Sequence, residues 1–108
     1  MPLWLFTARD KPGMLETRKA TRPTHRDYIT RKDLPAEMVF GSPLLDDNGD
    51  MDGTWLVLLA ETKADVEAFC AGDPYRVVAD LFDTTEIRQL APGFDWTPKV
   101  EDLEDRLG

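Results

Sequence analysis

Two segments of this chain are apolar at consecutive positions, and this pattern limits how the chain can fold. The segments Leu3–Ala8 and Trp55–Leu59 have the length and composition of strands. Successive side chains of a strand point to opposite faces, so both faces of these strands must be covered. An uncovered face of this kind would be a large exposed apolar patch. We therefore expect a homodimer in which two sheets pack face to face.

The remaining elements follow from periodicity and from helix-capping residues. Thr62 and Asp73 can each cap the start of a helix, and Gly72 ends the helix between them. The predicted order is β-α-β-β-α-β, the split β-α-β arrangement with an antiparallel sheet, so the fold class is α+β. The strands are expected at Leu3–Ala8, Met38–Leu44, Thr54–Glu61 and Phe82–Leu90, and the helices at Met14–Lys32, Thr62–Gly72 and Asp73–Leu81.

Pro23 lies within the first helical segment. Proline has no amide hydrogen and clashes with the preceding turn, but it suits the first position of a helix. We therefore expect two helical pieces, Met14–Ala20 and a second that starts near Pro23.

Composition excludes several classes of protein. The 108 residues carry a net charge of −8, which argues against nucleic acid or an anionic membrane as partner. No apolar stretch approaches the length of a membrane span, and the N-terminus lacks the features of a signal peptide, so we expect a cytoplasmic protein. The single cysteine excludes an internal disulfide, and the single histidine excludes a zinc site with two imidazole ligands.

The segment from Arg9 to Lys32 is basic although the chain as a whole is acidic. It holds eight basic and three acidic residues, which gives it a charge of +5, and it contains the only histidine, His25. A solvated helix face is one interpretation of such a charge run. The other is a local field that attracts a small anionic ligand toward His25.

His25 and Asp73 are the candidate catalytic residues. On a helix, His25 shares a face with Arg18 and Arg22. A structural histidine and a helix-capping aspartate are the alternatives, but a carboxylate has two oxygens and could cap with one while it orients the imidazole with the other. Two helices on one sheet face can bring these residues together. We expect their side chains within hydrogen-bond reach, beside a pocket that also exposes Arg22.

Two other motifs predict no chemistry. The segment Asn48–Gly53 resembles the start of a calcium loop, but Leu59 stands where the bidentate glutamate belongs, so we expect a hairpin turn. Cys70 lies on the apolar face of a helix and is expected to be a buried, inert thiol. We expect neither a metal ion nor a cofactor.

Four short segments, taken together, resemble the YciI-like (YCII-related) proteins. The resemblance covers about residues 1–92 and predicts one domain there, with 93–108 as a C-terminal extension. The segments are Ala8–Gly13, Arg22–Tyr28, Gly41–Leu44 and Gly72–Tyr75.

The resemblance implies a ferredoxin-like dimeric α+β barrel with a His–Asp active site, which maps onto His25 and Asp73. One branch of the family is similar to a dehydrochlorinase that acts on a chlorinated hydroxyhydroquinone, and the wider superfamily includes muconolactone isomerases. We therefore expect a cofactor-free enzyme of lyase or isomerase type acting on a small anionic or enolic molecule. The candidate substrate-binding residues are Arg22, Arg9, Ser42 and Tyr75, with Arg18 as a further cation.

In this hypothesis His25 is the general acid or base, because imidazole changes charge near neutral pH. Asp73 would hold the imidazole in one tautomer. A non-catalytic module that binds a small ligand, or a dimerising protein in which both residues are structural, remain the alternatives on the same scaffold.

Overall fold

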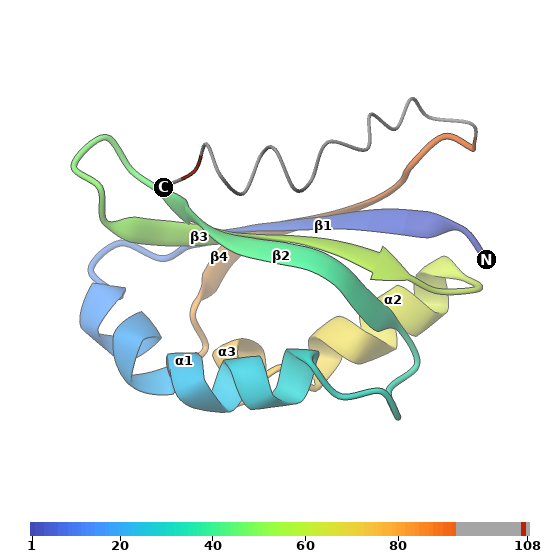
Figure 1. Ribbon diagram of the computed structural model, residues 1–108. Helices are drawn as coiled ribbons and strands as arrows, with labels where there is room; N and C mark the ends of the chain where they lie inside the picture. The colour runs from blue at the N-terminus through green and yellow to red at the C-terminus, as the bar shows by residue number, and fades with distance from the viewer. Residues whose placement is uncertain (93–106, 108) are drawn as a thin grey trace.

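In the computed structural model, the helices within residues 1–92 cover one face of a four-stranded antiparallel sheet (Figure 1). The structure describes residues 1–92 and 107, so the expected extension 93–108 lies outside the described residues apart from Leu107. The strand order is β2-β3-β1-β4. The elements are β1 (Leu3–Asp10), α1 (Leu15–Ile29), β2 (Glu37–Leu45), β3 (Met51–Leu59), α2 (Lys63–Ala71), α3 (Pro74–Val77) and β4 (Phe82–Gln89).

This is the ferredoxin-like α+β fold that the sequence predicted, and every neighbouring pair of strands is antiparallel. Over Leu3–Ala8 of β1 and Thr54–Leu59 of β3, the even-numbered side chains point toward the helices and are buried, whereas the odd-numbered ones are half-buried on the other face. Trp4 and Leu58 pair across these strands, and the Trp4 indole donates a hydrogen bond to the carbonyl of Ala60 at 3.0 Å.

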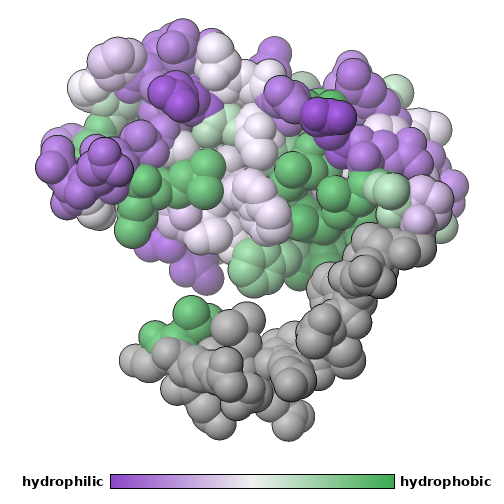
Figure 2. All heavy atoms as spheres, turned by 90° about the horizontal axis from the view of Figure 1, so that it is seen from above, coloured by the Kyte–Doolittle hydropathy of each residue, from purple (hydrophilic) through white to green (hydrophobic). Residues whose placement is uncertain are grey.

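The other side of the sheet, here called the outer face, is rich in apolar side chains (Figure 2). The register places Leu5 beside Val57, and Val57 beside Phe40 of β2. Phe40 is 58% exposed and contacts the ring of Trp55 edge-on at 5.7 Å. The expected apolar outer face is therefore present in the described part of the chain.

The expected break at Pro23 is wrong, because α1 runs continuously from Leu15 to Ile29. Proline removes one hydrogen bond, the one that its amide would donate to the carbonyl of Lys19. Both residues are exposed, so water can satisfy that carbonyl. On the opposite side of the helix, Arg18, His25 and Ile29 are buried. Their packing keeps the helix continuous before and after Pro23.

The capping predictions for α2 and α3 are confirmed. The Thr62 hydroxyl accepts a hydrogen bond from the amide of Asp65, and the Asp73 carboxylate accepts one from the amide of Tyr75. Helix α3 ends at Val77 and not near Leu81 as expected, because the chain turns at Asp80, which has a φ of +47°.

The hairpin between β2 and β3 is built around Asp46. Its Oδ1 accepts hydrogen bonds from the amides of Asn48 at 2.9 Å and of Asp50 at 3.0 Å. Gly49 supplies the positive φ of +84° that this turn needs. The carboxylate of Asp46 therefore holds the acidic loop as a hairpin turn. Within the part of the chain that the structure describes, no helix is long and apolar enough to cross a membrane.

Candidate functional site

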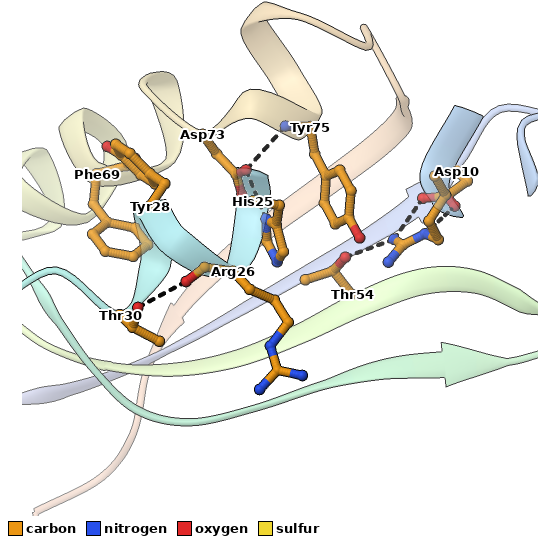
Figure 3. A network of polar contacts seen from close by, with 10 residues as sticks. Asp10, His25, Arg26, Tyr28, Thr30, Thr54, Phe69, Asp73 and Tyr75 are labelled. Atoms are coloured by element: carbon orange, nitrogen blue, oxygen red, sulfur yellow. Dashed lines mark hydrogen bonds and ion pairs between the residues drawn. The ribbon is translucent and has the colours of Figure 1, made fainter. Parts of the chain in front are cut away.

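The side chains of His25 and Asp73 meet between α1 and the start of α3 (Figure 3). Nδ1 of His25 lies 2.7 Å from Oδ1 of Asp73. Both residues are buried, at 6% and 2% exposure. The two side chains are 48 positions apart in the chain, and they lie within the hydrogen-bond distance that the sequence analysis expected.

Asp73 reaches this position because it also begins α3. Its Oδ1 accepts the amide hydrogen of Tyr75 at 3.0 Å and faces the imidazole of His25. These two tasks were expected of different oxygens, whereas in the structure one oxygen performs both. A carboxylate can only accept hydrogen bonds, so Nδ1 of His25 carries the hydrogen of this contact.

Tyr75 packs against the imidazole. Its ring is stacked on that of His25, with 3.8 Å between the ring centroids and 14° between the planes. The Arg18 guanidinium carbon lies 4.6 Å from the centroid of the same tyrosine ring. Burial raises the pKa of Tyr75, while the positive charges of Arg18 and Arg22 oppose this effect. The phenol is therefore protonated at neutral pH.

Arg18 is fixed by a buried ion pair that the sequence analysis missed. Its Nε and Nη2 donate to the two carboxylate oxygens of Asp10 at 2.6 and 2.9 Å, and Nη2 also donates to the Thr54 hydroxyl at 2.7 Å. Arg18 is 1% exposed. Its charge is thus neutralised by Asp10, and the side chain supports the wall of the site. The even-residue alternation of β1, continued to position 10, was the signal that Asp10 points inward.

A pocket of about 170 Å³ lies between α1 and the strands β2 and β3. An engineered cavity of about 150 Å³ is large enough to bind benzene, so this pocket fits about one six-membered ring. Apolar side chains of Ile29, Met38 and Leu56 form part of its wall, and His25 and Tyr75 form another part.

The same pocket is cationic. Arg22 and Arg26, one helical turn apart on α1, both line it. Among the described residues, no carboxylate lies within ion-pair distance of either guanidinium. Since Asp10 neutralises Arg18, these two arginines supply the charge that an anionic ligand would meet. Arg26 was not among the expected site residues, although its position four residues after Arg22 was a usable signal.

The other expected residues are placed differently. Arg9 lies on β1 and lines separate hollows with Asp52 and Thr84, so it is not brought to the His25 pocket. Ser42 borders the pocket, but the register pairs it with Trp55 on the outer face. Its hydroxyl donates a hydrogen bond to the carbonyl of Pro43 at 2.9 Å.

Cys70 lies on the core side of α2. Burial, and to a lesser extent the negative charge of Asp73, raise the pKa of its thiol to about 12. Such a thiol is protonated at neutral pH and is a poor nucleophile. Within residues 1–92 and 107, no group of three His, Cys, Asp or Glu side chains is arranged to hold a metal ion.

Comparison with known proteins identifies one sequence family. The model of the YCII-related domain matches residues 2–91. No curated protein matches the chain.

Among solved structures, 5-chloro-2-hydroxyhydroquinone dehydrochlorinase (TftG) from Burkholderia phenoliruptrix AC1100, in complex with 2,5-dihydroxybenzoquinone, is similar. It is 30% identical, the match covers 84% of this chain and 95% of that one, and the TM-score is 0.70.

Two more distant structures show the same fold. An uncharacterised NIPSNAP domain protein from Burkholderia xenovorans is 18% identical, with 90% of this chain and 100% of that one covered and a TM-score of 0.54. Protein Atu4242 from Agrobacterium tumefaciens is 17% identical, with 91% and 98% covered and a TM-score of 0.55.

Proposed function

The chain belongs to the YCII-related family, and from this premise we propose that it is a small cofactor-independent enzyme of lyase or isomerase type. The observation that carries the proposal is the 2.7 Å contact between Nδ1 of His25 and Oδ1 of Asp73, at the wall of a pocket sized for one ring. The imidazole is the general base or acid, and Asp73 is the positioning residue that holds it.

The hydrogen bond to Asp73 fixes the tautomer of His25. With Nδ1–H donated to the carboxylate, Nε2 is the atom that accepts a proton from the substrate. Asp73 then stabilises the imidazolium that forms, because the negative charge lies at hydrogen-bond distance from it. The stacked ring of Tyr75 prevents the imidazole from turning away.

A base of this kind supports two related reactions. His25 takes a proton from an O–H or C–H bond of the substrate. The electron pair of that bond stays on the substrate, which becomes an enolate. In a lyase, the enolate electrons form a new double bond and a leaving group departs with its own electron pair. In an isomerase, the imidazolium returns the proton to another carbon. Neither reaction needs an oxidant or a reductant.

The cations of the pocket suit a substrate that carries negative charge. Arg22 and Arg26 line the pocket beside His25 and have no carboxylate partner in the described part of the chain. They hold the anionic or enolate oxygens of the substrate by charge-assisted hydrogen bonds. Arg9 and Ser42 take no part in this proposal, because of where their side chains lie.

The 30% identity to a dehydrochlorinase supports a chlorinated, hydroxylated ring as the first substrate to test. In the keto tautomer of such a ring the chlorine-bearing carbon has gained a proton, and loss of a hydroxyl proton to His25 then expels chloride with its electron pair. The cavity has room for one such ring.

The proposal also includes a homodimer that buries the outer face. Leu5, Val57 and Phe40 form a row on that face, and Phe40 is 58% exposed. A second copy of the chain covers this surface in the manner expected from the sequence.

The test is chloride release from 5-chloro-2-hydroxyhydroquinone under anaerobic conditions, with a panel of hydroxylated rings and lactone acids beside it. His25→Gln and Asp73→Asn should each lower turnover by about 100-fold to 10,000-fold. Asn caps a helix nearly as well as Asp, so the second variant keeps the fold. Asp65→Asn, the same change in the first turn of α2, is the matched control. An Asp73→Asn variant with the wild-type rate would contradict the proposal.

A further inference from the structure

The hydroxyl of Tyr75 is buried without a hydrogen-bond partner. Tyr75 is 1% exposed, and its hydroxyl is the one buried side-chain nitrogen or oxygen among the described residues that has no partner. Buried polar groups in native proteins are nearly always paired, so such an atom at the wall of a pocket points to a ligand.

The tyrosine ring has little freedom to turn toward another partner. The imidazole of His25 is stacked on it at 3.8 Å, the Arg18 guanidinium lies 4.6 Å from its centroid, and Phe82 meets it edge-on at 6.1 Å. Side chains on several elements therefore hold the ring where it is. Figure 3 shows the ring alongside the imidazole, with its hydroxyl directed toward the side of the sheet where Thr54 lies.

In the part of the chain that the structure describes, no neighbouring group accepts the hydrogen of the Tyr75 hydroxyl. Arg18 cannot accept the hydrogen of the phenol, because a guanidinium is only a donor. The hydrogen of the phenol therefore still needs an acceptor. Because burial raises the pKa of Tyr75, that hydrogen is present at neutral pH.

We propose that the Tyr75 hydroxyl donates a hydrogen bond to a ring-borne oxygen of the ligand, and that this contact selects the substrate class. The ligand is a single ring with a carbonyl, enolate or phenolate oxygen beside the group that His25 deprotonates. This inference rests on the proposed function, because it assigns an atom of the substrate in the same pocket. Arg22 and Arg26 then balance the negative charge that develops on the ring oxygens.

The test compares two tyrosines that differ in one respect. Tyr28 donates its hydroxyl hydrogen to the carbonyl of Phe69 at 2.7 Å, whereas the Tyr75 hydroxyl has no such partner. Tyr75→Phe and Tyr28→Phe remove the same atom and keep each ring. The thermal midpoint of each variant and its affinity for 2,5-dihydroxybenzoquinone are measured on the full chain, with an optical titration for binding.

For Tyr75→Phe, we expect a thermal midpoint equal to or above that of the wild type and an affinity about tenfold weaker. For Tyr28→Phe, we expect the reverse pattern: a midpoint lower by about 4–8 °C and an unchanged affinity. The two phenylalanine variants thus separate a ligand-facing hydroxyl from a structural one.

Three results would overturn the inference. One is a midpoint that falls as far in Tyr75→Phe as in Tyr28→Phe, which would show a structural partner. Another is a wild-type affinity retained in Tyr75→Phe, and the third is a wild-type protein that does not bind the ring. The proposed function fails on a different result, turnover that survives His25→Gln, so the two failures are distinguishable.

Discussion

The hydroxyl of Tyr28 occupies the space into which a side chain at Gly72 would project. A Cβ atom added to Gly72 would lie 2.5 Å from that hydroxyl oxygen and 3.1 Å from the ring carbon that bears it. The backbone of Gly72 has a φ of −92°, which any residue can adopt. Glycine is therefore required at this helix end for space and not for its conformation.

Gly72→Ala should destabilise the protein by about 1–3 kcal/mol, because Tyr28 must move and lose its bond to the Phe69 carbonyl. Urea unfolding measures the loss. Adding Tyr28→Phe removes the nearest clashing atom, so the double variant should be more stable than the sum of the two single effects predicts. A Gly72→Ala protein as stable as the wild type would contradict this explanation.

The buried pair of Arg18 and Asp10 should be far more sensitive to substitution than an exposed pair. Asp10→Ala leaves a buried guanidinium without its anion and should cost about 3–5 kcal/mol. The matched control is Asp33→Ala, which breaks an exposed pair with Arg31 and should leave the free energy of unfolding nearly unchanged. Equal losses of stability in chemical denaturation would contradict this prediction.

Adding Arg18→Met to Asp10→Ala should restore part of the stability, since the unpaired charge is removed. The same double variant should bind 2,5-dihydroxybenzoquinone more weakly than the wild type, because Tyr75 loses the guanidinium beside its ring. Restored stability together with wild-type affinity would place the support of Tyr75 elsewhere.

The buried thiol of Cys70 makes the free energy of unfolding depend on pH in the alkaline range. Its pKa is about 12 in the folded protein against an ordinary value of 9.0. The folded state therefore binds the proton more tightly, and this contribution is complete below pH 9 and is lost as the pH rises toward 12. The difference in unfolding free energy between the wild type and Cys70→Ala should shrink over that range. In the native protein at pH 8, a thiol reagent should modify Cys70 only as fast as the protein opens.

The outer face of the sheet should hold two copies of the chain together. Val57→Asp places a charge in the middle of the apolar row and should produce a monomer in light scattering at micromolar concentration. Val78→Asp makes the same change at a residue that is 74% exposed on the helical side, and it should leave the dimer intact. A wild-type monomer at these concentrations would contradict the dimer.

The elements governed by local chemistry were predictable from the sequence. Thr62 and Asp73 cap their helices with their own side chains, and a cap is read from a few adjacent residues. The break expected at Pro23 was wrong because the helix is held by burial of its opposite side. Tertiary packing of that kind outweighs the loss of one hydrogen bond. A rule based on the residues next to proline takes no account of such packing.

The candidate site was predictable only in part. His25 and Asp73 were singled out by residue type and by family resemblance, but helix spacing alone could not show that they meet across 48 positions. Arg18 was expected to face the ligand, and the structure turns its charge toward Asp10 and Thr54. The alternation along β1 turns Asp10 inward, but only the packing of α1 on the sheet shows that Arg18 meets it. The same holds for the stacking of Tyr75 on His25.

One oxygen of Asp73 joins the proton chemistry of His25 to the local folding of α3. The amide of Tyr75 and the imidazole of His25 share Oδ1, so a change in the charge of the imidazole changes the strength of the hydrogen bond that begins the helix. The Tyr75 amide is therefore a natural reporter of the site. Its exchange with deuterium and its NMR chemical shift record the protonation of His25 without any substrate or assay.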